Sequence, residues 1–458
     1  MSQKKYAISL KERISYALGD VGCNFVWSVV ASFLTLYYTD SVGIAAATVG
    51  TILLVTRLLD GLTDLGFGLI LDKTKTKMGK ARPWILWSTP MMALGLIALF
   101  SVPDSLGDNG KVVYAFLTYV FVAAIAYTAS NLSYNTLLAL MTDDQPSKIS
   151  ANSLRFIFTS LFVIVMAYIV PPMVEKIGWS MMAVIFACLA TLCFAVTFFG
   201  VKERNKAAMQ TAVQGTDKSL GAVQSFKLLF SNRYFYTICI MFLAYYINAS
   251  IFNGMGVYVC RDILHDINLY GTLNACYMGA KFVLLLFVPF LATRYGKWKL
   301  MISGWSIVIL GMFIMWVGSE NVYMVMCGAI LRGVGLGPIS ACLFTIIADA
   351  VEYGEWKTGV NQAGLTNSAT SFGMKVGTGL GSAIVGWGLA LGDYNPDLAA
   401  QTDYTLMFEA GVFFLLPIGF FVIALIAMYF TNIDKIYPQI IKDLNERHAK
   451  QAAAQAEA

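Results

Sequence analysis

The chain has 458 residues, of which 58% are hydrophobic and 13% are charged, and its formal net charge is +5. A soluble domain of this length does not need so much apolar surface, so the composition excludes an ordinary water-soluble protein. The small positive charge is explained below by membrane topology and gives no reason to expect a nucleic-acid partner.

Runs of about 20 apolar residues recur along nearly the whole chain, which is the signature of membrane-spanning helices. Strand-like alternation is absent, and a helix satisfies its own backbone hydrogen bonds in lipid, so we expect an all-α integral membrane protein. The first sixteen residues are polar and lack the features of a signal peptide, so we expect no cleavage. The twelve expected transmembrane helices are 20–39, 45–71, 83–102, 112–141, 153–174, 180–200, 234–258, 267–292, 300–318, 322–349, 361–391 and 404–431.

The chain divides near its middle at a polar segment. We expect an N-terminal six-helix bundle over residues 1–200, a cytoplasmic linker over 201–233, a C-terminal six-helix bundle over 234–431 and a cytoplasmic tail over 432–458. Each half carries Gly and Lys in a short basic turn after its second span. We therefore expect the two bundles to be pseudo-symmetric, with a binding site near the midplane between them.

The 32 Lys and Arg residues are unevenly distributed over the loops. Most fall in segments on the side of the two termini, including a basic turn that runs from Lys73 to Arg82. By the positive-inside rule, both termini are cytoplasmic, and the protein is a multi-pass protein of the cytoplasmic (plasma) membrane.

The second expected span contains three ionisable residues on one helical face: Arg57, Asp60 and Asp64. An ionisable group in hydrocarbon costs at least about 2.5–3.5 kcal/mol, so these side chains are expected to face a protein interior or a wet cavity. Converging carboxylate oxygens suit a small hard cation or a proton. The alternative is an ion-pair cluster with a purely structural role.

Polar residues recur at helical spacing in three other spans, one of which is the eleventh, with Asn367, Ser371, Lys375 and Thr378. Trp27 follows Asn24 by three residues in the first span, and Thr128, Asn131 and Asn135 form a stripe in the fourth. Amides donate and accept hydrogen bonds as sugar hydroxyls do, and an indole ring can cover a pyranose ring. Helix–helix hydrogen bonding is the alternative, but the stripes together with the carboxylates favour a shared polar cavity.

Cysteine and histidine patterns give no sign of a cofactor. The eight cysteines form no CxxC pair, and the two histidines lie outside the expected spans. The glycine-rich segments lack the spacing and the preceding strand of a phosphate-binding loop, which argues against direct use of ATP. We expect no cofactor, and no metal beyond a monovalent cation such as Na⁺, for which a proton is the alternative, at Asp60 and Asp64.

Four motifs, taken as a set, resemble those of the glycoside–pentoside–hexuronide:cation symporters of the major facilitator superfamily. The resemblance covers nearly the whole chain, from about Leu10 to about Leu444. That family includes melibiose permease. The resemblance implies the twelve-helix major facilitator fold, a sugar substrate and a co-transported cation. The motifs are LTLYYTD at 34–40, GTILLVTRLLDGLTD at 50–64, GKARPWIL at 79–86 and ADAVEYGEWKTG at 348–359.

The resemblance implies a cation site at Asp60 and Asp64 with Thr128 nearby. Melibiose permease has an asparagine before the second of these aspartates, whereas this chain has Thr63, which offers a hydroxyl instead of an amide oxygen. The choice between Na⁺ and H⁺ stays open at this point.

The family's sugar site corresponds to Asn24, Asn131, Arg155 and Lys375. The first two are aspartates in melibiose permease and neutral here, so we do not expect melibiose as the substrate. Lys281 is a further cation within a span. These cations lead to the hypothesis of an acidic substrate such as a hexuronide, and a neutral pentoside or other glycoside is the alternative.

Charged residues near the basic turn are expected to control the rate of transport. We assign gating to Asp72, Arg82, Glu352 and Glu355, and we expect the basic side chains of the turn to form ion pairs near Glu352 and Glu355. The expected partners are a small-molecule sugar, a monovalent cation and membrane lipid, and the protein is expected to be a monomer. Rival functions are an exporter of the same fold, a membrane enzyme or flippase acting on lipid-linked sugar, and a sensor without transport.

Overall fold

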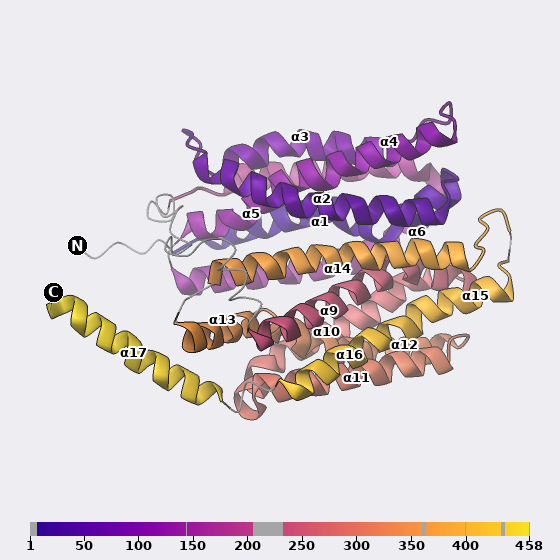
Figure 1. The fold of residues 1–458 in the computed structure, drawn as a ribbon. Coiled ribbons are helices and arrows are strands. Elements are labelled where there is room, and N and C mark those ends of the chain that lie inside the picture. The colour runs from indigo at the N-terminus through magenta and orange to yellow at the C-terminus, as the bar shows by residue number, and fades with distance from the viewer. Residues whose placement is uncertain are drawn as a thin grey trace. The chain divides into compact units, whose positions relative to one another are not determined.

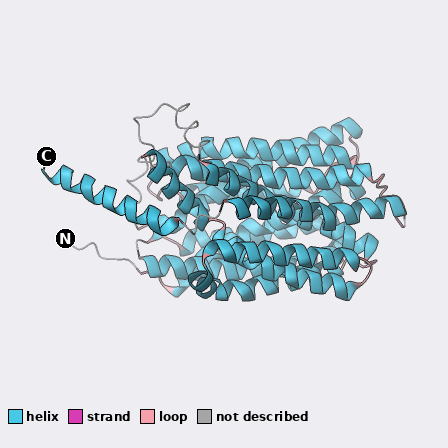
Figure 2. Cartoon of the chain, turned by 60° about the horizontal axis from the view of Figure 1, so that its bottom comes forward, coloured by secondary structure: helices cyan, strands magenta, loops and turns pink. Residues whose placement is uncertain are grey.

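The computed structural model describes residues 7–142, 144–204, 232–359, 363–398, 400–431 and 436–457. Every regular element in this part of the chain is a helix (Figures 1 and 2). The all-α prediction is therefore confirmed. Most of the expected linker, residues 201–233, lies outside the described residues.

The first half of the chain forms long helices interrupted by short π-helical turns. The longest, α6, turns at Gly178, whose φ of 76° lies in the left-handed region, so α6 contains both the fifth and the sixth expected spans. The helices are α1 (Leu10–Leu36), η1 (Tyr37–Ser41), α2 (Ala46–Lys73), α3 (Arg82–Leu99), α4 (Asp108–Val120), η2 (Phe121–Tyr127), α5 (Thr128–Met141) and α6 (Gln145–Gly200).

The second half has the same character, and it ends in a polar helix, α17, which shows that the expected tail is helical. Its helices are α9 (Arg233–Tyr258), η3 (Val259–Ile263), α10 (Leu269–Tyr295), α11 (Lys297–Val317), α12 (Val322–Cys342), α13 (Thr345–Thr358), α14 (Ala363–Leu391), α15 (Asp403–Ala410), η4 (Gly411–Leu415), α16 (Leu416–Phe430) and α17 (Tyr437–Glu457).

Nine helical stretches among the described residues are long and apolar enough to cross a membrane. One of them, Pro146–Gly200, is 55 residues long and contains the turn at Gly178, so it accounts for two of the expected spans. The spans expected at 83–102 and 361–391 are helical as α3 and α14, although they are not among these nine. The chain is therefore a multi-pass membrane protein.

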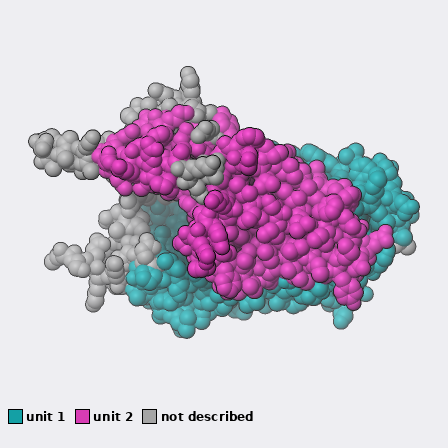
Figure 3. Space-filling model, turned by 90° about the horizontal axis from the view of Figure 1, so that it is seen from below, with its two compact units in different colours: residues 1–213, 249–275, 378–413 teal, residues 214–248, 276–377, 414–458 magenta. Residues whose placement is uncertain are grey.

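Two compact units make up the chain (Figure 3). In unit 1, α1 packs along α6, and Tyr16 stacks on Tyr134 with ring centroids 4.7 Å apart. In unit 2, α11 packs along α12 and α16. Unit 1 comprises residues 1–213, 249–275 and 378–413, and unit 2 comprises residues 214–248, 276–377 and 414–458.

Within unit 1, helices α2 and α14 approach each other at two glycines. A Cβ atom added to Gly386 would lie 2.7 Å from the Cα atom of Gly50, so neither position has room for a side chain. This contact holds α14 close to the helix that carries Asp60.

Candidate functional site

Asp60 is buried on α2, with 2% of its surface exposed, and both of its carboxylate oxygens are engaged. Oδ2 accepts a hydrogen bond from Nη1 of Arg57 at 2.8 Å. Oδ1 accepts a hydrogen bond from the hydroxyl of Thr128, at the start of α5, at 2.9 Å. The structure thus brings together three of the residues singled out in the sequence, since an i,i+3 spacing places Arg57 and Asp60 on one helical face.

The other two expected cation ligands lie on the next turn of α2. Asp64 is half-buried. The hydroxyl of Thr63 donates to the backbone carbonyl of Asp60 at 3.1 Å, so its proton is directed at the helix backbone and not at a carboxylate. In the described residues, no group of three or more His, Cys, Asp or Glu side chains is arranged to hold a metal ion. Two carboxylates and a hydroxyl are a donor set suited to a proton or a weakly held monovalent cation as cargo.

Arg57 connects this acid to an aromatic surface. Its guanidinium carbon lies 3.6 Å from the ring centroid of Trp27, and the Trp27 ring in turn lies 5.1 Å from that of Tyr127. Arg57 is only 5% exposed, and a desolvated cation–π contact is worth about 2 kcal/mol. Trp27, which was expected to cover a sugar ring, therefore has Arg57 against one face.

The polar stripe of the fourth span forms a hydrogen-bonded row. The amide of Asn131 donates to the hydroxyl of Tyr127 at 3.3 Å, and the amide of Asn135 donates to Oδ1 of Asn131 at 2.9 Å. Nη1 of Arg155 donates to Oδ1 of Asn135 at 3.0 Å. The structure therefore joins three of the expected substrate residues on α5 and α6 into one row.

Asp20 completes this row at its far end. Nε of Arg155 lies 3.5 Å from Oδ2 of Asp20, which also accepts a hydrogen bond from Thr159. The amide of Asn24 donates to the backbone carbonyl of Asp20 at 2.8 Å, and Ser28 donates to the amide oxygen of Asn24. Asp20 is only 7% exposed and pairs with Arg155, a pairing that the sequence did not predict.

A continuous series of contacts thus connects the two buried acids of this site, Asp60 and Asp20, within unit 1. It starts at the Thr128 hydroxyl and ends at the Asp20 carboxylate, and successive members are joined by hydrogen bonds, an ion pair or aromatic contact. Its members in order are Thr128, Asp60, Arg57, Trp27, Tyr127, Asn131, Asn135, Arg155 and Asp20. We call this series the polar relay.

The remaining two expected substrate residues lie in unit 2. Nζ of Lys281 on α10 lies 3.2 Å from the hydroxyl of Tyr245 and 5.9 Å from the ring centroid of Tyr277. The guanidinium carbon of Arg332, whose side chain is fully buried, lies 4.4 Å from the same Tyr277 ring. Two cations and two phenols therefore form one cluster, and Lys375 lies half-buried on α14.

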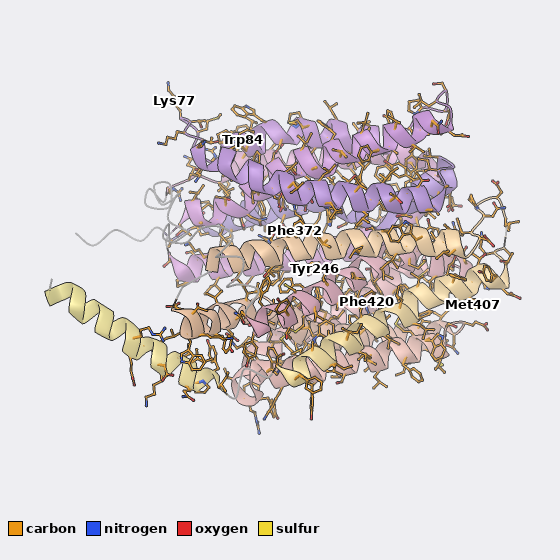
Figure 4. The ribbon with its side chains drawn as sticks, in the orientation of Figure 1. Lys77, Trp84, Tyr246, Phe372, Met407 and Phe420 are labelled. Carbon is orange, nitrogen blue, oxygen red and sulfur yellow. The ribbon has the colours of Figure 1, made fainter. Side chains whose placement is uncertain are left out.

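The basic turn between α2 and α3 is held by an acid that the sequence did not single out. The carboxylate of Glu203 accepts hydrogen bonds from the backbone N–H groups of Lys80, Ala81 and Arg82 at 2.7–2.9 Å. Nη2 of Arg82 donates to the backbone carbonyl of Phe198 at 2.8 Å. Figure 4 labels Lys77 and Trp84, which mark this turn. The side chain of Asp72, the other expected gating residue here, lies outside the described residues.

The expected acidic partners of that turn belong to unit 2. The hydroxyl of Tyr437 on α17 donates to Glu352 at 2.6 Å, and Arg447 donates to the backbone carbonyl of Glu355 at 3.2 Å. Burial, followed by the hydrogen bond to Glu352, raises the pKa of Tyr437, so its hydroxyl remains a donor. Within unit 2, both acidic positions are thus bound to α17, and their pairing with Arg82 stays a prediction.

One deeply buried acid was missed. Sequence reasoning recognised only Asp60 and Asp64 as acids deep within the spans, but Glu409 on α15 is fully buried. The available signal was an acid inside the apolar run LMFEAGVFF, which begins at Leu406.

Comparisons with known proteins agree with this architecture. Residues 15–435 match the family model described as MFS/sugar transport protein. The chain is 33% identical to the isoprimeverose transporter of Lactiplantibacillus pentosus over 98% of this chain and 94% of that protein. It is 28% identical to the glucuronide carrier protein homolog of Escherichia coli (strain K12), over 96% of each chain.

Two further matches concern coupling and fold. A putative glycoside/cation symporter, YagG of Escherichia coli (strain K12), is 26% identical over 98% of this chain and 97% of that protein. The solved structure of the nucleoside transporter NupG superposes with a TM-score of 0.67 at 15% identity, over 91% of this chain and 98% of that one. The second match supports the fold alone.

Proposed function

The chain belongs to the MFS/sugar transport protein family, and we propose that it moves a small glycoside inward together with a monovalent cation. It is a sugar symporter and not an enzyme. The polar relay is the observation that supports placing the cation and the sugar at particular residues. It joins the buried Asp60 to the row of amides on α5.

We assign the cation to Asp60 and Asp64, with the Thr128 hydroxyl as a further oxygen. Arg57 neutralises Asp60 in the absence of a cation, at an N–O distance of 2.8 Å. A cation that binds the carboxylates competes with Arg57, and a displaced Arg57 changes its contact with Trp27. Cation binding therefore biases the shape of the sugar site, which is the differential interaction that coupling requires.

We assign the sugar to the amide row together with Trp27. Asn131 and Asn135 offer donors and acceptors that match sugar hydroxyls, and these neutral amides suit an uncharged glycoside. The similarity to an isoprimeverose transporter supports this substrate class.

A sugar acid is a second candidate, and one observation favours it. Lys281 and Arg332 share the Tyr277 ring in unit 2, and the contacts of Lys281 are with phenols rather than with a carboxylate. A substrate carboxylate would offset two neighbouring positive charges. The similarity to a glucuronide carrier homolog is consistent with this reading.

We further propose that the protein lies in the cytoplasmic membrane with both termini inside, as the distribution of Lys and Arg predicts. On this orientation, the basic turn is cytoplasmic and η1 and η3 face outward.

Uptake into proteoliposomes tests the proposal. Labelled glycosides and glucuronides are supplied under an imposed Na⁺ gradient, a pH gradient, or neither. We expect accumulation above equilibrium under one of the two gradients and only equilibration without them. Accumulation that needs neither gradient would contradict symport, and accumulation of glucuronides alone would select the second candidate.

A further inference from the structure

A second charged cluster lies in unit 1, where η1, η3 and the segment before α15 meet. Arg261 binds Asp262 through two hydrogen bonds, at 2.7 Å to Oδ1 and 2.9 Å to Oδ2. The same guanidinium donates to Asp40 and to the hydroxyl of Tyr394. Tyr394 in turn donates to both oxygens of Asp40, at 2.9 and 3.0 Å. Arg261 and Tyr394 therefore tie the end of the first membrane helix to η3.

Glu409 lies behind this cluster, on α15, which packs against η3. Its side chain is fully buried, and neither carboxylate oxygen accepts a hydrogen bond from a described residue. Among the charged groups around the Glu409 carboxyl, Asp262 has the strongest electrostatic interaction with it. Arg261 and Asp40 interact with it more weakly. Two carboxyl groups that face each other in a buried place cannot both be ionised without large repulsion.

We propose that Glu409 is a proton-binding site separate from Asp60, and that the protonated carboxyl donates a hydrogen bond to Asp262. A proton supplies the one donor that the pair lacks, because both oxygens of an ionised carboxylate are acceptors. It also removes the cost of an unpaired buried charge.

The other groups around Glu409 do not take over this role. Arg261 has its donors on Asp40, Asp262 and Tyr394. Burial, followed by the charge of Asp40, raises the pKa of Tyr394, so the phenol stays neutral. Tyr258 on α9 is occupied with the Thr39 hydroxyl at 2.9 Å.

A cavity beside the cluster gives the proton a route. It has a volume of about 300 Å³ and is lined by Arg261, Asp262, His265 and Tyr394, among others. Water in this space can reach Asp262, which lines the cavity and interacts with Glu409. The side chain of His265 lines the same cavity.

Ionisation of Glu409 has a defined consequence for the link to η1. With Glu409 neutral, Arg261 balances one of the two charges of Asp40 and Asp262. A charged Glu409 adds a second uncompensated negative charge beside Asp262 and draws Arg261 toward itself. The bond from Arg261 to Asp40 therefore weakens as the pH rises and Glu409 loses its proton.

Infrared spectroscopy of the purified protein tests the site without any sugar. A protonated buried carboxyl has its own carbonyl stretching band, which shifts in deuterated water. We expect such a band near neutral pH in the native protein, its loss in Glu409→Gln, and its retention in Asp403→Asn, a matched change at an exposed position on the same helix. A band unchanged in Glu409→Gln would overturn the proposal, as would a band in native protein that disappears on adding Na⁺ at constant pH.

Hydrogen–deuterium exchange tests the consequence. After correction for the intrinsic pH dependence of exchange, we expect Tyr37–Ser41 to exchange faster as the pH rises in the native protein and to lose this dependence in Glu409→Gln. Asp262→Asn supplies an amide donor in place of the proton and is expected to show the same loss. A pH dependence equal in all three proteins would contradict the assignment to Glu409. Neither measurement depends on transport, so a failure here is distinct from a failure of the proposed symport.

Discussion

Replacing Asp60 by Asn isolates the role of its charge, because the two side chains have nearly the same shape. The amide keeps an oxygen that can accept the Thr128 hydroxyl, but it removes the negative charge 2.8 Å from Arg57. We expect Asp60→Asn to abolish accumulation driven by the cation gradient, while sugar exchange at equal concentrations on the two sides of the membrane persists.

The cost in stability follows from the burial of the pair. The side chains of Arg57 and Asp60 are 5% and 4% exposed, and removing one partner of a buried ion pair typically costs about 3–5 kcal/mol. The contact between the guanidinium carbon and the Trp27 ring, at 3.6 Å, is already present in the native protein, so it does not reduce this difference. We therefore expect a loss of about 3–5 kcal/mol in the free energy of unfolding.

A double variant separates the two effects. Arg57→Gln combined with Asp60→Asn leaves no buried charge, so we expect its thermal stability to recover while accumulation stays abolished. Accumulation and exchange are measured in proteoliposomes at matched protein content, and stability is measured by thermal unfolding in detergent. Gradient-driven accumulation at the native level in Asp60→Asn would refute the reasoning. So would a loss of sugar exchange in Asp60→Asn as complete as its loss of accumulation.

The remaining predictions concern other parts of the site. Thr128→Val should weaken cation binding about 10- to 100-fold, since a hydrogen bond to a charged group is worth about 1.5–3 kcal/mol; the cation concentration for half-maximal uptake measures this. Glu203→Ala should slow transport with little change in substrate affinity, because three backbone N–H groups lose their acceptor, and Glu203→Gln should restore the rate only in part, because its one oxygen can serve two of the three. Lys281→Met should lower the affinity for glucuronides about tenfold or more if the substrate is a sugar acid and leave neutral glycosides unaffected, as competition assays would show. Gly386→Leu should block transport or folding of unit 1, since there is no room for a Cβ atom at α2; thermal unfolding and exchange distinguish the two.

The predictable part of this molecule is the part set by local periodicity. Hydrophobic runs predict the helices, and an i,i+3 spacing predicts that Arg57 meets Asp60, because both depend on one helix only. Contacts between helices were not predictable in this way. The partners of Arg155 come from α1 and α5, and Glu203 reaches the basic turn across more than 120 residues. Glu409 was overlooked since one acid in an apolar run has no periodic partner.

The position of Arg57 explains how one cation could control a site built from neutral amides. None of the amides on α5 is charged, so a cation at Asp60 has little direct electrostatic effect on Asn131. Arg57 lies between the two and contacts both the Asp60 carboxylate and the Trp27 ring. A cation that takes over Asp60 releases an arginine that is otherwise paired, and in a buried place this arginine must find another partner. The Trp27 ring already contacts this guanidinium, and its neighbour Tyr127 accepts the hydrogen bond of Asn131. We therefore propose that the coupling free energy passes through the movement of the Arg57 guanidinium, and we expect a substitution at Trp27 to alter cation affinity.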